Sequence, residues 1–151
     1  MRYYEDFKVG EVLEFGGHKM IKEEMLDFAR RYDPQTFHVD EEAAKTSIYG
    51  ELTAAGLHVA ALMLRMWHFD GPESASEGSP GWDNLRWLKP VIPGDTLRVR
   101  AEIVEKRRLN SRPHIGVLTI DQAVLNQRDE AVTTMRTSWF MRLRDPSVVI
   151  R

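Results

Sequence analysis

The sequence predicts a single α+β domain, residues 1–151, in which a curved antiparallel sheet wraps around one buried central helix. The first observation is the segment 57–67, where nine of eleven residues are apolar. A helix of that composition has no polar face for solvent, so we expect it to be buried nearly all round. The second observation is that the chain from Trp82 onward consists of strand-like segments separated by short turns. One helix followed by a run of antiparallel strands is typical of an α+β domain.

The segments before the central helix are predicted to be one strand and two helices. Residues 12–21 are rich in strand formers and alternate loosely, which favours a first strand. Residues 22–33 place apolar side chains on one helical face, and Asp33-Pro34 ends this helix because a residue before proline avoids the helical conformation. A short helix is expected to begin at Asp40, whose carboxylate can cap it.

The segments after the central helix are predicted to be strands, over residues 82–91, 96–107, 114–127 and 131–144. Between Leu97 and Ile103, apolar and charged residues alternate, as in a strand with one buried face. Short turns between the segments favour an antiparallel meander with the helix on its concave face. Such a sheet leaves free edges and an uncovered flank, so we expect at least a homodimer.

Composition narrows the class of protein. The chain has 21 basic and 23 acidic residues, a net charge of −2, so no overall field attracts nucleic acid. It has no cysteine, which excludes disulfides, thiolate-bound zinc and cysteine nucleophiles. The N-terminal segment is polar, and no apolar run reaches the roughly 18–20 residues that cross a bilayer. We expect a soluble cytoplasmic protein with neither a membrane nor a nucleic-acid partner.

Asp33 and His38 are the first candidates for chemistry. They lie five residues apart in a turn that Pro34 stiffens, so both side chains can point into one cleft. A carboxylate and an imidazole that converge on one water molecule are suited to general acid–base catalysis. The alternative is that Asp33 only ends a helix and His38 makes a loop hydrogen bond. Asp40 with His38 also forms a possible metal pair, but no third ligand is near, so we expect no metal and assign Asp40 to the helix cap.

Gly56, at the start of the central helix, is the second candidate. A glycine N–H at the positive end of a helix can approach a substrate oxygen and stabilise negative charge there. The alternative is a glycine that only allows a tight turn into the helix. His58, two residues further on, is expected to be a core histidine.

With these residues in view, the chain resembles the MaoC-like dehydratases, the (R)-specific enoyl-CoA hydratase group of the hot dog fold. The resemblance extends over about residues 4–143. The family's motif D-x-N-P-x-H-x-D is matched by Asp33, His38 and Asp40, while Gln35 and Thr36 stand in place of its Asn-Pro.

Two later segments add to the resemblance. Gly56 corresponds to the family's glycine at the mouth of the central helix, although Ala55 stands where a histidine often precedes that glycine. The stretch KPVIPGDTL, residues 89–97, is similar to the family's turn between two strands.

The resemblance implies a hydro-lyase of fatty acid metabolism that reversibly adds water to a trans-2-enoyl-CoA to give an (R)-3-hydroxyacyl-CoA. It implies Asp33 and His38 as the catalytic pair and the Gly56 N–H as the oxyanion donor. The coenzyme A thioester is the substrate, and no separate cofactor is expected. Weaker candidates are Trp82 for the substrate pocket and Arg86 for coenzyme A, together with Arg107, Arg108 and Arg112. A hot dog acyl-CoA thioesterase and a non-catalytic acyl-CoA-binding protein remain as alternatives.

Overall fold

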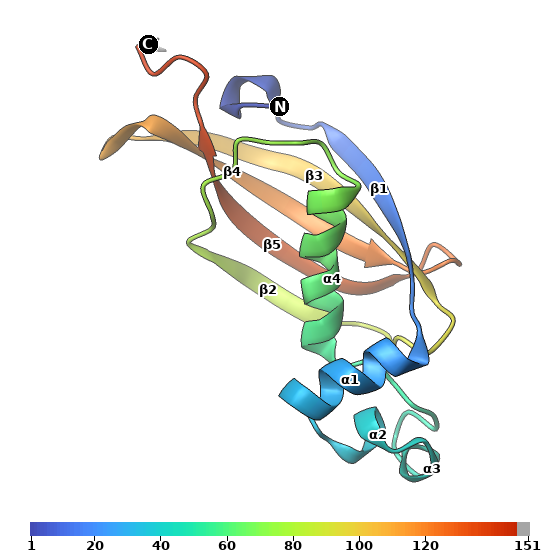
Figure 1. Cartoon of the computed structure of the whole chain (residues 1–151). Helices are drawn as coiled ribbons and strands as arrows, with labels where there is room; N and C mark the ends of the chain where they lie inside the picture. The colour runs from blue at the N-terminus through green and yellow to red at the C-terminus, as the bar shows by residue number, and fades with distance from the viewer. Residues whose placement is uncertain (148–151) are drawn as a thin grey trace.

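One long helix, α4, lies across the concave face of a five-stranded antiparallel sheet (Figure 1). The computed structural model describes residues 1–147, so the last four residues of the predicted domain, 148–151, lie outside the described residues. The elements are η1 (Tyr4–Asp6), β1 (Val12–Lys19), α1 (Lys22–Tyr32), α2 (Thr36–Val39), α3 (Glu41–Ala44), α4 (Gly56–Phe69), β2 (Gly81–Trp87), β3 (Thr96–Leu109), β4 (Arg112–Leu125) and β5 (Ala131–Arg142). The predicted α+β class and every predicted helix and strand are confirmed.

The order of the strands in the sheet is β1-β3-β4-β5-β2. Strands β3, β4 and β5 form the expected meander, but the prediction of a continuous meander is wrong for β2. This strand pairs with β5 at the far edge, where Trp87 lies opposite Thr133. The connection from β2 to β3 is not a tight hairpin, because it runs past the segment before α4, where the Ala54 N–H donates to the Val91 carbonyl at 2.8 Å. This path places the end of β2 beside the start of α4.

Helix α4 forms the core with the inner face of the sheet. Val59, Met63 and Met66 are almost completely buried and belong to the same apolar cluster as the alternating inward residues of β3. The prediction that this helix is buried nearly all round is wrong on one side, since Leu57 is 58% exposed and Leu64 is 44% exposed. A single sheet covers only one side of a helix. Among residues 1–147, no helix combines the length and apolar character needed to span a bilayer.

The three short helices α1, α2 and α3 pack at the N-terminal end of α4 (Figure 1). Helix α1 ends before Asp33, as the Asp33-Pro34 pair predicts. The carboxylate of Asp40 accepts hydrogen bonds from the N–H groups of Glu42 and Ala43, at 3.0 and 3.1 Å, and so caps α3 as predicted. The Thr53 N–H donates to the Phe37 carbonyl, which fixes α2 against the segment that leads into α4. The turn with the predicted acid–base pair is therefore held at the mouth of the central helix.

Candidate active site

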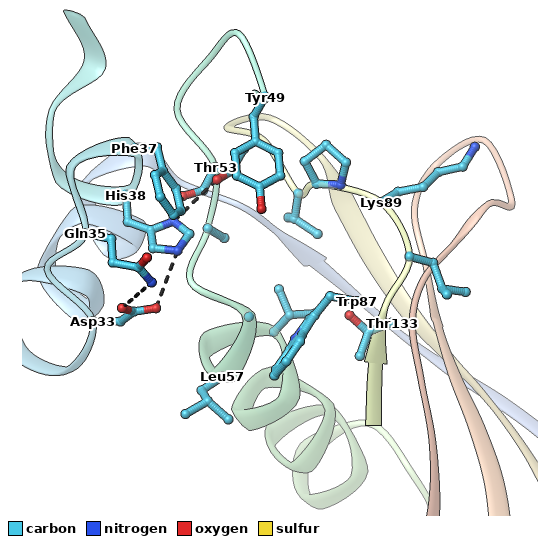
Figure 2. A pocket seen from close by; sticks show the side chains of 16 residues that line it. Asp33, Gln35, Phe37, His38, Tyr49, Thr53, Leu57, Trp87, Lys89 and Thr133 are labelled. Carbon is cyan, nitrogen blue, oxygen red and sulfur yellow. Dashed lines mark hydrogen bonds and ion pairs between the residues drawn. The ribbon is translucent and has the colours of Figure 1, made fainter. Parts of the chain in front are cut away.

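A cavity of about 470 Å³ at the N-terminal end of α4 brings together Asp33, His38 and Gly56 (Figure 2). One wall comes from residues 33–38 and a second from residues 87–91, at the end of β2 and just beyond it. The other lining residues are Tyr49, Thr53, Ala54, Leu57, Val59 and Thr133. The three residues predicted from the sequence, up to 23 positions apart, thus share one cavity because the turn and the start of α4 lie side by side.

His38 is held in one orientation by the backbone of the segment before α4. The side chain is buried, and its Nδ1 lies 2.7 Å from the Thr53 carbonyl oxygen. A carbonyl only accepts, so Nδ1 carries a proton and donates it. The Nε2 atom lies 3.4 Å from Oδ2 of Asp33. A neutral His38 therefore presents an acceptor, Nε2, beside the Asp33 carboxylate.

Asp33 is the residue that ends α1, and its carboxylate is oriented by Gln35. The Gln35 side-chain amide donates a hydrogen bond to Oδ1 of Asp33 at 2.8 Å. The other oxygen, Oδ2, is the one that faces His38. Sequence reasoning treated Gln35 only as a departure from the family motif and missed this contact. The available signal was that both the motif residue, asparagine, and Gln35 carry a side-chain amide.

Gly56 is the first residue of α4. The N–H of a first helical residue has no acceptor within its own helix, and the partial positive charge of the helix end adds to it. A Cβ atom at this position would overlap Nε1 and Cε2 of the Trp87 indole and would lie 2.9 Å from its Cδ1. Glycine is therefore needed here for the indole to pack against the start of the helix.

Trp87, Tyr49 and Thr133 line the cavity and were not identified from the sequence. The Tyr49 hydroxyl points into the cavity, and the Trp87 indole stands across it from Asp33 and His38 (Figure 2). The Thr133 hydroxyl is buried and has no hydrogen-bond partner among the described residues. No role was predicted for Trp87. Only the pairing of β2 with β5 brings it to the cavity, and no local pattern signals that pairing.

The weaker candidates lie elsewhere. Trp82 lines a second cavity, of about 710 Å³, together with Trp67 and Trp139. Arg86 lines neither cavity, and its guanidinium donates to the Leu85 carbonyl at 3.2 Å. Contacts of Trp82 or Arg86 with substrate stay predictions. The β3–β4 hairpin, which carries the arginines at positions 107, 108 and 112, lies at the opposite end of the sheet from the start of α4 (Figure 1).

His58 is buried on α4 and lies outside the lining of the Asp33 cavity, as expected of a core histidine. Its ring stacks on Phe28 of α1 with a centroid distance of 4.6 Å, and its Nε2 lies 3.3 Å from Oε1 of Glu24. Glu24 also lies 3.2 Å from Nε2 of His18. Burial lowers the pKa of His58 and outweighs the opposing effect of Glu24. Within residues 1–147, no three His, Asp or Glu side chains gather in a way that would hold a metal ion.

The antiparallel sheet wrapped around α4 is the hot dog fold, which confirms the predicted architecture. The family model of the MaoC like domain matches residues 6–124, and the chain therefore belongs to the MaoC-like domain family. The recognition made from the Asp33, His38 and Gly56 motifs is thus confirmed at the level of the family.

Individual relatives have modest sequence identity to this chain. The chain is 28% identical to the Bacillus subtilis protein YdeM over 85% of its own length and 90% of that protein. It is 27% identical to a mesaconyl-CoA hydratase of Cereibacter sphaeroides, covering 95% of this chain and 42% of the hydratase. A crystal structure of a MaoC-like dehydratase from Rhodospirillum rubrum superposes with a TM-score of 0.90 and 33% identity, covering 96% of this chain and 99% of that one.

Proposed function

We propose that the protein is a hydro-lyase that reversibly adds water to a trans-2-enoyl-CoA and yields an (R)-3-hydroxyacyl-CoA. The observation that carries the proposal is the convergence of Asp33 Oδ2 and His38 Nε2, 3.4 Å apart, on the cavity that Gly56 also lines. Membership of the MaoC-like family supports a hydratase or dehydratase, and the mesaconyl-CoA hydratase is a relative whose substrate is an acyl-CoA thioester.

The catalytic pair is suited to activating one water molecule. Asp33 and neutral His38 both present acceptors on the same wall, so a water molecule can donate one hydrogen bond to each. In the proposed step, Asp33 takes a proton as the water oxygen forms a bond to the β carbon. His38 orients the water through Nε2. General base catalysis of this kind contributes about 10²–10⁴-fold in rate.

The thioester oxygen receives the electrons of the broken carbon–carbon π bond. As the new carbon–oxygen bond forms, that pair moves through the α carbon to the thioester carbonyl, which becomes an enolate. The Gly56 N–H at the positive end of α4 stabilises this charge, an effect worth roughly 10²–10³-fold for a single donor. The enolate then collapses as the α carbon takes the proton that Asp33 accepted from the water, which leaves Asp33 ionised again.

The remaining lining of the cavity suits an acyl chain. Leu57, Val59, Leu88 and Val91 supply apolar surface beside the start of α4. Desolvation of an acyl chain against these side chains contributes about 0.8 kcal/mol per buried methylene. The coenzyme A moiety would leave the cavity through its open side.

We further propose that the working unit is a homodimer. Leu57 and Leu64 are exposed on the side of α4 that faces away from the sheet, and β2 is an edge strand. A second copy placed over α4 and β2 would cover both features.

A direct test is to follow the enoyl absorbance of trans-2-butenoyl-CoA after addition of the protein. The wild type is expected to remove it and to form the (R)-hydroxy product, identified by chiral chromatography. Asp33→Asn and His38→Ala are each expected to lower kcat by about 10²-fold or more. The matched control is Asp27→Asn, which changes an exposed carboxylate on α1 that pairs with Arg31.

Full activity in both variants at positions 33 and 38 would contradict the assignment of the pair. Release of free thiol together with the free enoic acid, and no hydroxyacyl thioester, would indicate a thioesterase. Binding of the thioester without either change would indicate an acyl-CoA-binding protein.

A further inference from the structure

The indole of Trp87 packs directly against the start of α4. Trp87 is the last residue of β2, and it is fixed there by pairing with Thr133 and by the hydrogen bond from the Leu88 N–H to the Val132 carbonyl, 2.8 Å long. A Cβ built on Gly56 would overlap Nε1 and Cε2 and lie close to Cδ1, so it would sit over the face of the five-membered ring at Nε1. The face of the indole at its nitrogen, rather than the six-membered end, therefore lies against the first residue of the helix.

The separation of the two nitrogen atoms suits one shared acceptor. An ideal Cβ lies about 2.5 Å from the nitrogen of its own residue, so the overlap places Trp87 Nε1 within ~5 Å of the Gly56 nitrogen. Two N–H donors that each bind one oxygen at about 2.9 Å can be at most ~5.8 Å apart. One oxygen in the cavity can therefore lie within reach of both.

The Trp87 N–H has no acceptor in the part of the chain that the structure describes. Indole Nε1 only donates, and within residues 1–147 no carbonyl or side chain accepts a hydrogen bond from it. The side chain is half-exposed and lines the same cavity as Asp33, His38 and Gly56. An N–H in that place is available to a bound substrate.

We infer that Trp87 is a second oxyanion donor, whose Nε1–H binds the same thioester oxygen as the Gly56 N–H. The inference rests on the proposed function, because it assigns a role in the enolate-forming step. Both donors keep their protons, and each hydrogen bond strengthens as the carbonyl oxygen takes up negative charge. Donors placed in advance at the site of developing charge act mainly on the transition state.

The alternative is that Trp87 only provides an apolar wall for the acyl chain. Phenylalanine supplies a similar wall but no N–H, so Trp87→Phe separates the two roles. If Trp87 is a donor, Trp87→Phe should lower kcat about 10–100-fold while KM changes less than about threefold. If Trp87 is only an apolar wall, Trp87→Phe should keep the wild-type kcat, and Trp87→Leu alone should weaken the affinity for the substrate. Unchanged kcat in Trp87→Phe would overturn the inference.

A second measurement does not need turnover. The carbonyl stretch of a [1-¹³C]enoyl-CoA is recorded by infrared difference spectroscopy on the Asp33→Asn protein and on the Asp33→Asn/Trp87→Phe protein. Loss of a donor should move the band to higher wavenumber in the double variant, and identical bands would overturn the inference.

The two measurements also distinguish this inference from the proposed function. A wild-type protein that hydrates no enoyl-CoA would contradict the proposed function, yet the carbonyl band would still test Trp87. Thermal unfolding of each variant verifies that it is folded.

Discussion

The side-chain amide of Gln35 holds the Asp33 carboxylate by a hydrogen bond of 2.8 Å to Oδ1 and leaves Oδ2 directed at His38. Gln35 is itself exposed, so its position is set by the turn and not by packing. Removal of the amide should release the carboxylate. We predict that Gln35→Leu lowers kcat about tenfold, since an exposed hydrogen bond to a charged group is worth roughly 1.5 kcal/mol. Steady-state kinetics with a short enoyl-CoA measures this.

Gln35→Glu provides a sharper form of the same prediction. A carboxylate at position 35 would repel the Asp33 carboxylate, whereas leucine only removes the hydrogen bond. Gln35→Glu should therefore lower kcat/KM more than Gln35→Leu does, and added salt should reduce the difference. Equal kcat/KM for the two variants would mean that the contact with Asp33 does not persist in solution.

The effect of a substitution at Gly56 on kcat/KM should depend on which residue stands at position 87. A methyl group at Gly56 would displace the indole, so Gly56→Ala is expected to lower kcat/KM about 10²-fold. In a Trp87→Ala background the same change meets no indole and should cost much less. A double-mutant cycle in kcat/KM measures the coupling. Equal effects of Gly56→Ala in both backgrounds would show that the glycine acts independently of the indole.

Two buried threonines of β5, Thr133 and Thr137, allow the effect of a hydroxyl hydrogen bond on stability to be compared. Within residues 1–147, the Thr133 hydroxyl has no hydrogen-bond partner, whereas the Thr137 hydroxyl accepts a hydrogen bond of 2.7 Å from the Gln122 amide. Thr133→Val should therefore raise the free energy of unfolding by about 1 kcal/mol, and Thr137→Val should lower it by a similar amount. Urea unfolding measures both. Equal destabilisation by the two changes would contradict the difference in hydrogen bonding.

His58 should make stability dependent on pH. Burial lowers its pKa below the value near 6.5 of the unfolded chain, so the unfolded state takes up a proton first as the pH falls. The free energy of unfolding should therefore fall as the pH drops below about 6.5. His58→Gln keeps a donor toward Glu24 but does not titrate, so it should lose less stability between pH 7.5 and 5.5. The charged neighbours Glu24 and His18 are present in both proteins. Equal losses in urea unfolding would exclude His58 as the cause.

The exposed leucines of α4, Leu57 and Leu64, provide a test of the proposed dimer. Leu64 is 44% exposed and lies outside the lining of the Asp33 cavity. Leu64→Glu should convert the proposed dimer to a monomer, because a charge in an apolar interface has no partner. Light scattering after size-exclusion chromatography measures the mass. A wild-type monomer would contradict the dimer proposal.

Local patterns were sufficient to predict the elements and part of the site. The apolar run predicted α4, and the alternation around Val99 predicted β3. The spacing of Asp33 and His38 predicted that both side chains lie in one cavity. The position of β2 could not be predicted, because strand order depends on the path of a connection and not on the residues of the strand. Trp87 was missed for the same reason. The exposed side of α4 was missed because an apolar helix has the same sequence whether a sheet or a second chain covers it.

The hydrogen bond from His38 Nδ1 to the Thr53 carbonyl has a stereochemical consequence. It leaves Nε2 as the atom of His38 that can orient the attacking water, and Nε2 lies beside the Asp33 carboxylate that carries the proton. Under the proposed mechanism, hydroxyl and proton then reach the double bond from the same direction, which makes the addition syn. Hydration in deuterium oxide should yield a single diastereomer, with deuterium and hydroxyl added to one side of the former alkene.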